Sequence, residues 1–473
     1  MKKILVWILA FVMAFSTIGC GDATGGQGIG KKKDGFLVGF GKADITPYEQ
    51  VNLGGYGDDG SRISQGFVSM LYALSVVITD EEDNTLILIV TDLSWGDEER
   101  TRMVRKEIAE EYGISSEYVM LGGTHNHSGP AYNNASLMVK NYLNYWLESV
   151  MESVAMAMED RKPSQMQIGS TETENLTFVR RYIQEDGNLQ GDNYKITDSP
   201  LASHETEADE EVQMVRFVRE EGKDILITNW QSHANYASNT KNAGSDWVGP
   251  LRDKVEKELD VHCIYFQGAA GNLNPKSRLE GENKTKSIKE HGEAIADYVI
   301  AAYKDESAFT SVNTGLIEVK QERYTGKVNK SEDSKLEIAE QIYSQWKNTS
   351  NYSLCVSEGL PHGIHSPYHA GAIITRNKES DTKEMELNTI SIGDVSIVTF
   401  PTEMFDVSGM QIKDQTPYEM TLLMGYSCGI HNYTPDVDGF ARGGYEADNS
   451  LFESGTAEKI VEEYLKTLKE LHK

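Results

Sequence analysis

Short apolar runs and longer stretches of helical spacing alternate along the chain. The runs that predict buried strands lie at residues 86–90, 118–121, 225–230, 264–266 and 395–400. Stretches with apolar residues three and four positions apart, which predict helices, lie at residues 102–112, 137–162, 247–259, 286–303 and 456–472. This alternation predicts the α/β class, with helices flanking a layered, mixed β-sheet. Residues 313–369 are less regular and predict mixed strands, one helix at 334–346 and a long loop.

No internal repeat or low-complexity block divides the chain. Its 473 residues would allow about three domains, but the uniform pattern predicts one large catalytic domain. The hydrophobic share of 39% is sufficient for a sizeable core and argues against the class of disordered proteins. Four cysteines are too few for a disulfide scaffold.

The N-terminus has the pattern of an export signal. Two lysines precede an apolar run at residues 4–15, which is too short to span a bilayer. A small residue then precedes Cys20, as in the bacterial lipobox, although Thr17 stands where that motif usually has Leu. We therefore predict lipidation at Cys20. An ordinary secretory signal with an incidental cysteine is the alternative.

These features divide the chain into three predicted parts. They are a lipoprotein signal peptide at residues 1–19, a Gly-rich flexible tether at residues 20–35 and the catalytic domain at residues 36–473. The predicted location is outside the cell, anchored to the bacterial membrane through the lipid. The net charge of −28 argues against binding nucleic acid and against binding anionic lipids by charge. Membrane contact is therefore expected through the lipid on Cys20.

Polar residues follow several predicted strands, where α/β proteins place functional groups. His125 and His127 follow one strand, and alternate side chains of an extended segment point to the same side. His233 and Glu403 follow two others. Histidine nitrogens and a carboxylate form a ligand set for catalytic Zn²⁺ with an open position for water. The alternative is that these are hydrogen-bonding residues that do not converge.

Three further segments have a composition typical of loops or binding sites. The small residues of QGAAGNLNP (267–275) predict backbone N–H groups that face an anion or oxyanion, with a tight turn as the alternative. The histidines of HGIHSPYH (362–369) predict a lid or surface loop, with a second metal site as the alternative. The acidic stretch 204–211 predicts a solvated loop.

Six motifs, in their order along residues 39–446, resemble the neutral (non-lysosomal) ceramidase family. They are GFGKADITP at 39–47, THNHSGP at 124–130, GSDWVG at 244–249, QGAAGNLNP at 267–275, FPTEMF at 400–405 and GFARGGYE at 439–446. THNHSGP is the most specific single match, and the ordered set is more specific than any member. The resemblance implies a zinc amidase that cleaves the N-acyl bond of ceramide into a sphingoid base and a fatty acid.

The resemblance also implies roles for individual residues. The implied zinc ligands are His125, His233, Glu403 and Tyr433. The implied catalytic residues are His127, which would face the substrate or support the ligands, Tyr445, which would donate a hydrogen bond to the oxyanion, and Arg180, which would bind the substrate. Arg181 is the rival of Arg180 for that last role.

The chain departs from the family pattern in three respects. Asn274 stands where the family has a serine and Asn272 where it has an aspartate, so a covalent acyl-serine route is not expected and Asn274 is at most a hydrogen-bond donor. The family's C-terminal immunoglobulin-like domain and the lining of its apolar pocket are not recognised in the sequence. A zinc hydrolase of a different acyl amide or ester, and a non-catalytic ligand-binding lipoprotein, therefore remain alternatives to a ceramidase.

Overall fold

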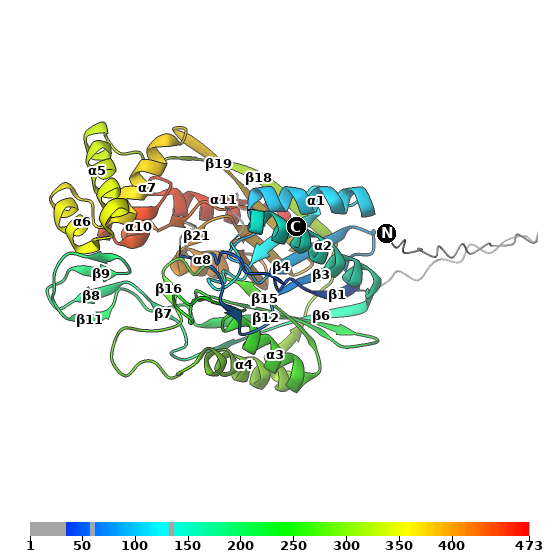
Figure 1. The fold of residues 1–473 in the computed structure, drawn as a ribbon. Coiled ribbons are helices and arrows are strands. Elements are labelled where there is room, and N and C mark those ends of the chain that lie inside the picture. Colours follow the sequence, from blue (N-terminus) through cyan, green and yellow to red (C-terminus); the bar gives the residue numbers. More distant parts are fainter. Residues whose placement is uncertain (1–34, 57–61, 132–136, 473) are drawn as a thin grey trace, which may run out of the picture. The chain divides into compact units, whose positions relative to one another are not determined.

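The computed structural model describes residues 35–56, 62–131 and 137–472 (Figure 1). The predicted signal peptide, nearly all of the tether and Cys20 lie outside the described residues. Residues 34–473 make up one compact unit. Among the described residues, no helix is both long enough and apolar enough to cross a bilayer.

A nine-stranded mixed sheet forms the centre of the fold. Its strand order is β15-β13-β12-β6-β1-β3-β4-β5, and β17 pairs with β6. These strands are β1 (Phe36–Asp44), β3 (Tyr72–Thr79), β4 (Thr85–Thr91), β5 (Val119–Gly123), β6 (Lys162–Glu172), β12 (Glu211–Arg219), β13 (Ile225–Trp230), β15 (His262–Gln267) and β17 (Phe309–Ser311). The pairs β4–β5 and β13–β15 are parallel, and the other pairs are antiparallel.

Both faces of this sheet are buried, which explains the continuous apolar runs in the sequence. On β4, Leu86, Leu88 and Val90 pack into one core, whereas Ile87 and Ile89 pack into another. Helices cover the second face in two pairs. They are α1 (Glu98–Tyr112) with α2 (Leu137–Glu159), and α3 (Val248–Leu259) with α4 (Ile288–Lys304).

A second, four-stranded sheet packs against the first face of the large sheet. Its order is β18 (Ile317–Lys327), β19 (Thr382–Ile392), β20 (Val395–Phe400) and β22 (Met420–Gly425). Helices α8 (Asp406–Gln415) and α11 (Thr456–Leu471) cover its other face. The layers are therefore helix, sheet, sheet and helix, which confirms the predicted α/β class with a layered mixed sheet and flanking helices.

The remaining elements of the described residues are five helices, three 3-10 turns and short strands. The helices are α5 (Asp333–Thr349), α6 (Tyr352–Gly359), α7 (Pro367–Lys378), α9 (Val437–Arg442) and α10 (Tyr445–Asn449), with 3-10 turns at Ser116–Tyr118, Glu306–Ala308 and Leu360–His362. The strands are β2 (Gly66–Phe67), β7 (Phe178–Val179), β8 (Tyr182–Gln184), β9 (Leu189–Gly191), β10 (Tyr194–Lys195), β11 (Leu201–His204), β14 (Asn242–Ala243), β16 (Leu273–Asn274), β21 (Glu403–Met404) and β23 (Tyr433–Thr434). In Figure 1, α5–α7 lie near β8, β9 and β11 at one end of the molecule.

The two edges of the large sheet meet around β22. The Asn229 side chain at the end of β13 donates to the carbonyl of Leu423 on β22 (2.9 Å) and accepts from its N–H (2.7 Å). On the other side, the N–H of Cys428, just after β22, donates to the carbonyl of Leu121 on β5 (3.0 Å). The carboxyl ends of β5, β13 and β20 are brought to one place in this way, although β5 and β13 lie near opposite edges of the sheet.

Candidate metal centre

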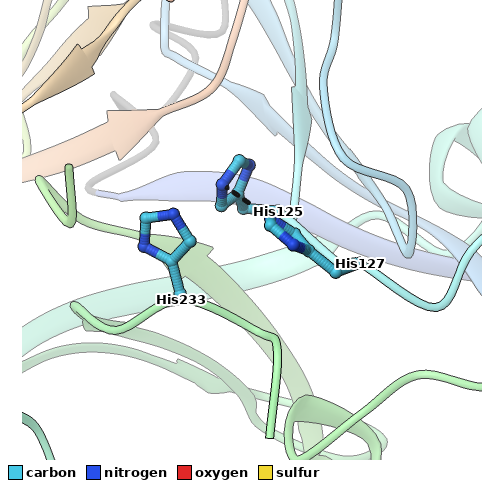
Figure 2. A group of neighbouring side chains, drawn as sticks. All are labelled: His125, His127 and His233. Atoms are coloured by element: carbon cyan, nitrogen blue, oxygen red, sulfur yellow. Dashed lines mark hydrogen bonds between the residues drawn. The ribbon is translucent and has the colours of Figure 1, made fainter. Parts of the chain in front are cut away.

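Three buried histidines converge where the strands end. His125 and His127 follow β5, and His233 follows β13. One ring nitrogen of each lies within 4.8 Å of the others, an arrangement that could hold a metal ion (Figure 2). Glu403, which opens β21 after β20, reaches the same point and is also buried. The sequence predicted each of these residues from its strand end, and the structure brings all four together.

The loop that carries His125 and His127 is held from several sides. His125 has a left-handed backbone (φ 56°), an uncommon conformation for a residue with a side chain. The side chain of Asn126 fixes this turn by donating to the carbonyls of Asp92 (3.0 Å) and Gly244 (2.7 Å). Gly55 also has a positive φ (93°), and a Cβ there would lie 2.4 Å from the His127 ring. Only glycine permits this approach.

The hydrogen bonds of the rings show which nitrogens are available. Nδ1 of His125 lies 3.2 Å from the carbonyl oxygen of Ser94, and Nδ1 of His233 lies 2.9 Å from that of Ala270. A carbonyl only accepts, so both Nδ1 atoms carry a proton, and in a neutral ring the Nε2 atom presents the lone pair. Main-chain partners of this kind fix the tautomer of metal-binding histidines.

The two lone pairs face a carboxylate oxygen. Nε2 of His125 and Nε2 of His233 lie 3.4 and 3.3 Å from Oε2 of Glu403. Oε2 is buried and has no hydrogen-bond donor among the described residues. Imidazole nitrogens and a carboxylate oxygen that face one another are a ligand set for a cation, so the group fits a metal ion.

The protonation states agree with this fit. Burial and the charge of Arg180 lower the pKa of His233 to about 3, so its ring is neutral at pH 7. Burial, together with the two neighbouring histidines, holds the pKa of His127 well below its usual range. Burial alone would raise the pKa of Glu403, but His125 and His233 lower it below the usual value. A metal ion needs these forms, neutral imidazoles and an ionised carboxylate.

His127 and Tyr433 lie beside His125, His233 and Glu403. Nε2 of His127 lies 3.2 Å from Nε2 of His125, which makes it a candidate third nitrogen ligand in addition to a residue that faces the cleft. Tyr433 is adjacent to Glu403 because their strands pair in parallel, and it lines the same cavity. Burial raises the pKa of the Tyr433 phenol well above its usual range, so the hydroxyl is neutral in the metal-free chain.

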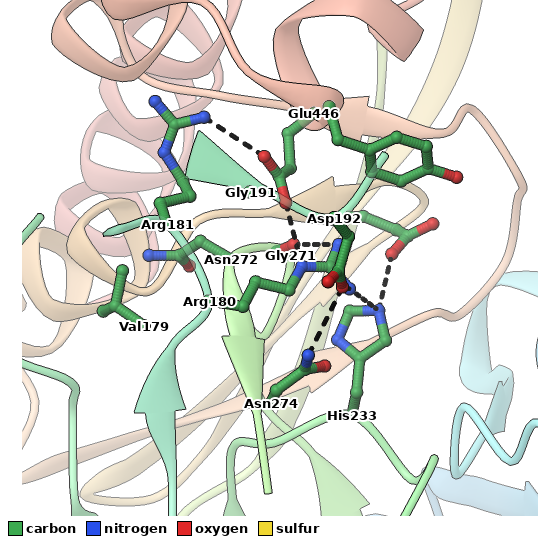
Figure 3. Close-up of polar contacts among 12 residues, drawn as sticks. Val179, Arg180, Arg181, Gly191, Asp192, His233, Gly271, Asn272, Asn274 and Glu446 are labelled. Atoms are coloured by element: carbon green, nitrogen blue, oxygen red, sulfur yellow. Dashed lines mark hydrogen bonds and ion pairs between the residues drawn. The ribbon is translucent and has the colours of Figure 1, made fainter. Parts of the chain in front are cut away.

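Arg180 borders this site and is buried. Its Nη1 is 3.3 Å from Nε2 of His233, and its Nη2 donates to the carbonyl of Gly271 (2.9 Å) (Figure 3). The guanidinium carbon lies 5.4 and 5.9 Å from the ring centres of Tyr433 and Tyr445. Burial raises the pKa of Tyr445, which keeps its hydroxyl able to donate a hydrogen bond.

Arg181 points away from the site and has a structural role. It pairs with Glu205 and donates to the carbonyls of Gly439 and Gly443. Of the two rivals, only Arg180 lines the cleft that borders the histidines.

Glu446 was not recognised in the sequence as part of the site. Its carboxylate is fully buried and accepts from Nε of Arg180 (2.8 Å) and from Nη1 of Arg181 (3.1 Å) (Figure 3). Glu446 therefore fixes the positions of both guanidinium groups and orients Arg180 toward His233. Its partners lie about 265 positions earlier in the chain, so local sequence offers no signal for the contact.

The segment 267–275 does not present the predicted row of free N–H groups. The N–H of Gly268 donates to Trp230 (2.8 Å) and that of Gly271 donates to Met404 (2.7 Å), while two carbonyls of the segment accept from His233 and Arg180. The oxyanion interpretation is therefore wrong for these two amides. A Cβ on Gly271 would lie 2.5 Å from the carbonyl oxygen of Glu403, so glycine is needed for close approach.

Asn272 and Asn274 have different surroundings. Asn272 is buried and bonds to Asp406 through both ends of its amide (2.7 and 3.0 Å), so its role is structural. Asn274 lines the cleft that also contains His127, Arg180 and Tyr445.

A second polar cluster joins α7 to α10. Asp448 lies 2.8 Å from Nδ1 of His365 and 3.1 Å from Nδ1 of His369, and this trio could also hold a metal ion. These are hydrogen-bond lengths. The cationic Arg376 donates to the carbonyls of Asp448 and Ser450, which disfavours a further cation there. The prediction of a loop for residues 362–369 is partly wrong, because α7 begins at Pro367.

Comparisons with known proteins agree with this geometry. Residues 36–267 match the family described as neutral/alkaline non-lysosomal ceramidase, N-terminal. Neutral ceramidase A of Dictyostelium discoideum is 31% identical over 139 residues, which are 28% of this chain and 19% of that protein. The aligned stretch thus spans about a fifth of the curated relative.

Two solved structures share the fold over most of this chain. One is described as a ceramidase complexed with C2 (TM-score 0.70, 18% identity, 92% of this chain and 75% of that chain). The other is neutral ceramidase from Pseudomonas aeruginosa (TM-score 0.69, 16% identity, 93% and 75%). The family match covers the histidine loops, and the shared fold covers more than nine-tenths of this chain. Residues 36–267 therefore belong to the N-terminal family of neutral/alkaline ceramidases, of which this chain is a divergent member.

Proposed function

We propose that this chain is a zinc-dependent hydrolase that cleaves an N-acyl amide bond. The observation that carries the proposal is the convergence of two imidazole lone pairs and a donor-free carboxylate oxygen on one buried point. A ligand-binding relic would have no physical need to keep these polar groups facing one another. Ceramide, which the names of the relatives indicate, is the first candidate substrate.

The distances within the group support zinc. Bonds of roughly 2.0–2.1 Å in a tetrahedral site separate the ligand atoms by about 3.3–3.4 Å. The separations from Oε2 of Glu403 to Nε2 of His125 and His233 are 3.4 and 3.3 Å. His125, His233 and Glu403 would hold the ion, and His127 and Tyr433 are placed to complete the set. When bound, zinc would polarise the amide carbonyl and lower the pKa of a water molecule.

The neighbouring side chains have complementary tasks in this proposal. Tyr445, neutral because burial raises its pKa, would donate a hydrogen bond to the oxygen on which negative charge develops. Arg180 places a positive charge next to His233, with Nη1 3.3 Å from Nε2 of that ring. Asn274 cannot act as a nucleophile, so we propose direct attack by water without an acyl-enzyme.

Metal content and turnover test the proposal together. Purified protein should contain about one zinc per chain, and His125→Ala should lose both the zinc and the hydrolysis of N-acyl amides. His362→Ala is the matched control, because His362 is exposed and lies outside the group. A wild-type chain that stays metal-free with zinc in excess would contradict the proposal.

We also propose that the protein is exported and anchored by a lipid on Cys20. The support is the sequence pattern at residues 1–20. Cys20→Ser should move the protein from the membrane fraction to the soluble fraction of the producing bacterium. Equal membrane content of both forms would refute the anchor.

A further inference from the structure

Two adjoining cavities meet at the candidate metal centre, and polar groups line much of both. The first, of about 240 Å³, contains His125, His127 and Glu403 and has a small apolar wall. That wall consists of Trp95, Pro130, Ala131 and Ile430. It offers room for only a few carbon atoms beside the point where the ligand atoms converge.

The second cavity, of about 320 Å³, is polar. It shares His127, Tyr433 and Tyr445 with the first cavity, so one bound molecule could occupy both. Its polar wall consists of Arg180, Asp192, Asn193, Asn235, Asn274 and Lys276. Among the described residues that line it, none is Leu, Ile, Val, Met or Phe.

Several of these polar groups retain capacity for a ligand. Asp192 lies 3.4 Å from Nδ2 of Asn274 and 3.7 Å from Nη1 of Arg180, which are longer than ordinary hydrogen bonds. The ammonium of Lys276 has three donors, of which one makes a normal bond, to the carbonyl of Tyr236 (2.8 Å). Carboxylate, amide and ammonium groups side by side can both accept from and donate to hydroxyl groups.

A long alkyl chain does not match this wall. It would remove water from Asp192, Asn274 and Lys276 without providing hydrogen bonds, and buried polar groups without partners are unfavourable. A hydroxyl-rich group would instead replace the water with bonds of its own. The apolar wall of the first cavity suits a short acyl group.

We propose that the substrate is an N-acylated amine with a short acyl chain and a hydroxyl-rich amine part, such as an amino sugar or amino polyol. This inference rests on the proposed amidase function. The acyl group lies against Trp95 and Ile430, the scissile amide lies at the metal centre, and the hydroxyl groups contact Asp192, Asn274 and Lys276. Water adds to the acyl carbon, the C–N bond breaks, and the amine leaves with a proton from water.

A comparison of four amides tests the substrate class. The probes are the N-acetyl and N-palmitoyl derivatives of glucosamine and of sphingosine, each assayed by release of the amine from zinc-loaded wild-type protein. We expect N-acetylglucosamine to have the highest kcat/KM, and lengthening the acyl chain or replacing the sugar to lower it by at least about tenfold each. A higher kcat/KM for N-palmitoylsphingosine would overturn the inference but support the amidase function. Absence of turnover on all four by zinc-loaded protein would count against both.

A substitution on the polar wall provides the second measurement. Asn274→Leu should raise KM for N-acetylglucosamine about three- to tenfold, the value of one hydrogen bond, with little change in kcat and no loss of zinc. Asn348→Leu on the exposed face of α5 makes the same chemical change away from the site and is the control. An unchanged KM in Asn274→Leu would refute the placement of the hydroxyl groups.

Discussion

Glu446 offers the sharpest test of how the site is held. Its side chain has no exposed surface and accepts from both Arg180 and Arg181, which are themselves buried. Glu446→Gln keeps the size and one acceptor oxygen but removes the negative charge between the two guanidinium groups. Arg181 retains its ion pair with Glu205, whereas Arg180 retains only a longer ion pair, with Asp192 at 3.7 Å.

The size of the effect follows from this arrangement. Removal of one partner from a buried ion pair destabilises a protein by about 3–5 kcal/mol, and we expect about 3 kcal/mol because Gln retains an acceptor. With a urea m-value of about 3 kcal/mol/M, the unfolding midpoint should fall by about 1 M, a large part of a typical stability of roughly 5–15 kcal/mol. Glu446→Ala, which retains no acceptor, should lower it further.

Urea unfolding followed by circular dichroism measures the shift. Glu470→Gln is the matched control, because Glu470 makes an exposed ion pair with Lys320 and its loss should change the midpoint little. Midpoint shifts of equal size in Glu446→Gln and Glu470→Gln would refute the reasoning. Folded Glu446→Gln should also have a lower kcat, because Arg180 is no longer held toward His233.

Three other predictions concern pH, thiols and the second cluster. Burial raises the pKa of Asp406 from 3.8 to about 6. The stability that this carboxyl contributes is therefore present below pH 4 and is lost as the pH rises to 6. In Asp406→Asn the urea midpoint of unfolding should depend less on pH between about 4 and 6. Burial raises the pKa values of Cys263 and Cys428 to about 12 and 11, so a thiol reagent at pH 8 should modify them only after unfolding; labelling in the native state would contradict this. Because the distances from Asp448 to His365 are hydrogen-bond lengths, His365→Ala should leave the bound zinc at about one per chain, and a fall in zinc content would refute the hydrogen-bonded interpretation.

Two strands that are buried on both faces were predicted to the residue, whereas β3 and β22, which are equally buried, were not predicted. The runs at 225–230 and 395–400 coincide with β13 and β20, because neighbouring side chains of these strands enter different cores. The helix α7 was missed, although Ser366 followed by Pro367 is a typical helix start. The histidines and the glycine of residues 362–369 instead favoured a loop or a metal site.

The candidate site was predicted by residue but not by geometry. His125, His233 and Glu403 were recognised from their strand ends and from the family motifs. Their convergence depends on β22, which lies between the ends of β5 and β13 and is linked to both by hydrogen bonds. Such contacts join segments far apart in the chain, and local patterns carry no information about them.

The helix α10 shows why the site depends on distant polar contacts. It has five residues, too few for a stable helix on propensity alone. Three of them connect it to its surroundings, because Tyr445 lines the cleft, Glu446 holds the two arginines and Asp448 bonds to His365 and His369 on the α7 side. The position of the Tyr445 hydroxyl is therefore set by ion pairs on the same helix. Substitutions at Glu446 or Asp448 should consequently alter the reaction at the metal centre, although neither carboxylate is among the residues that line the two cavities.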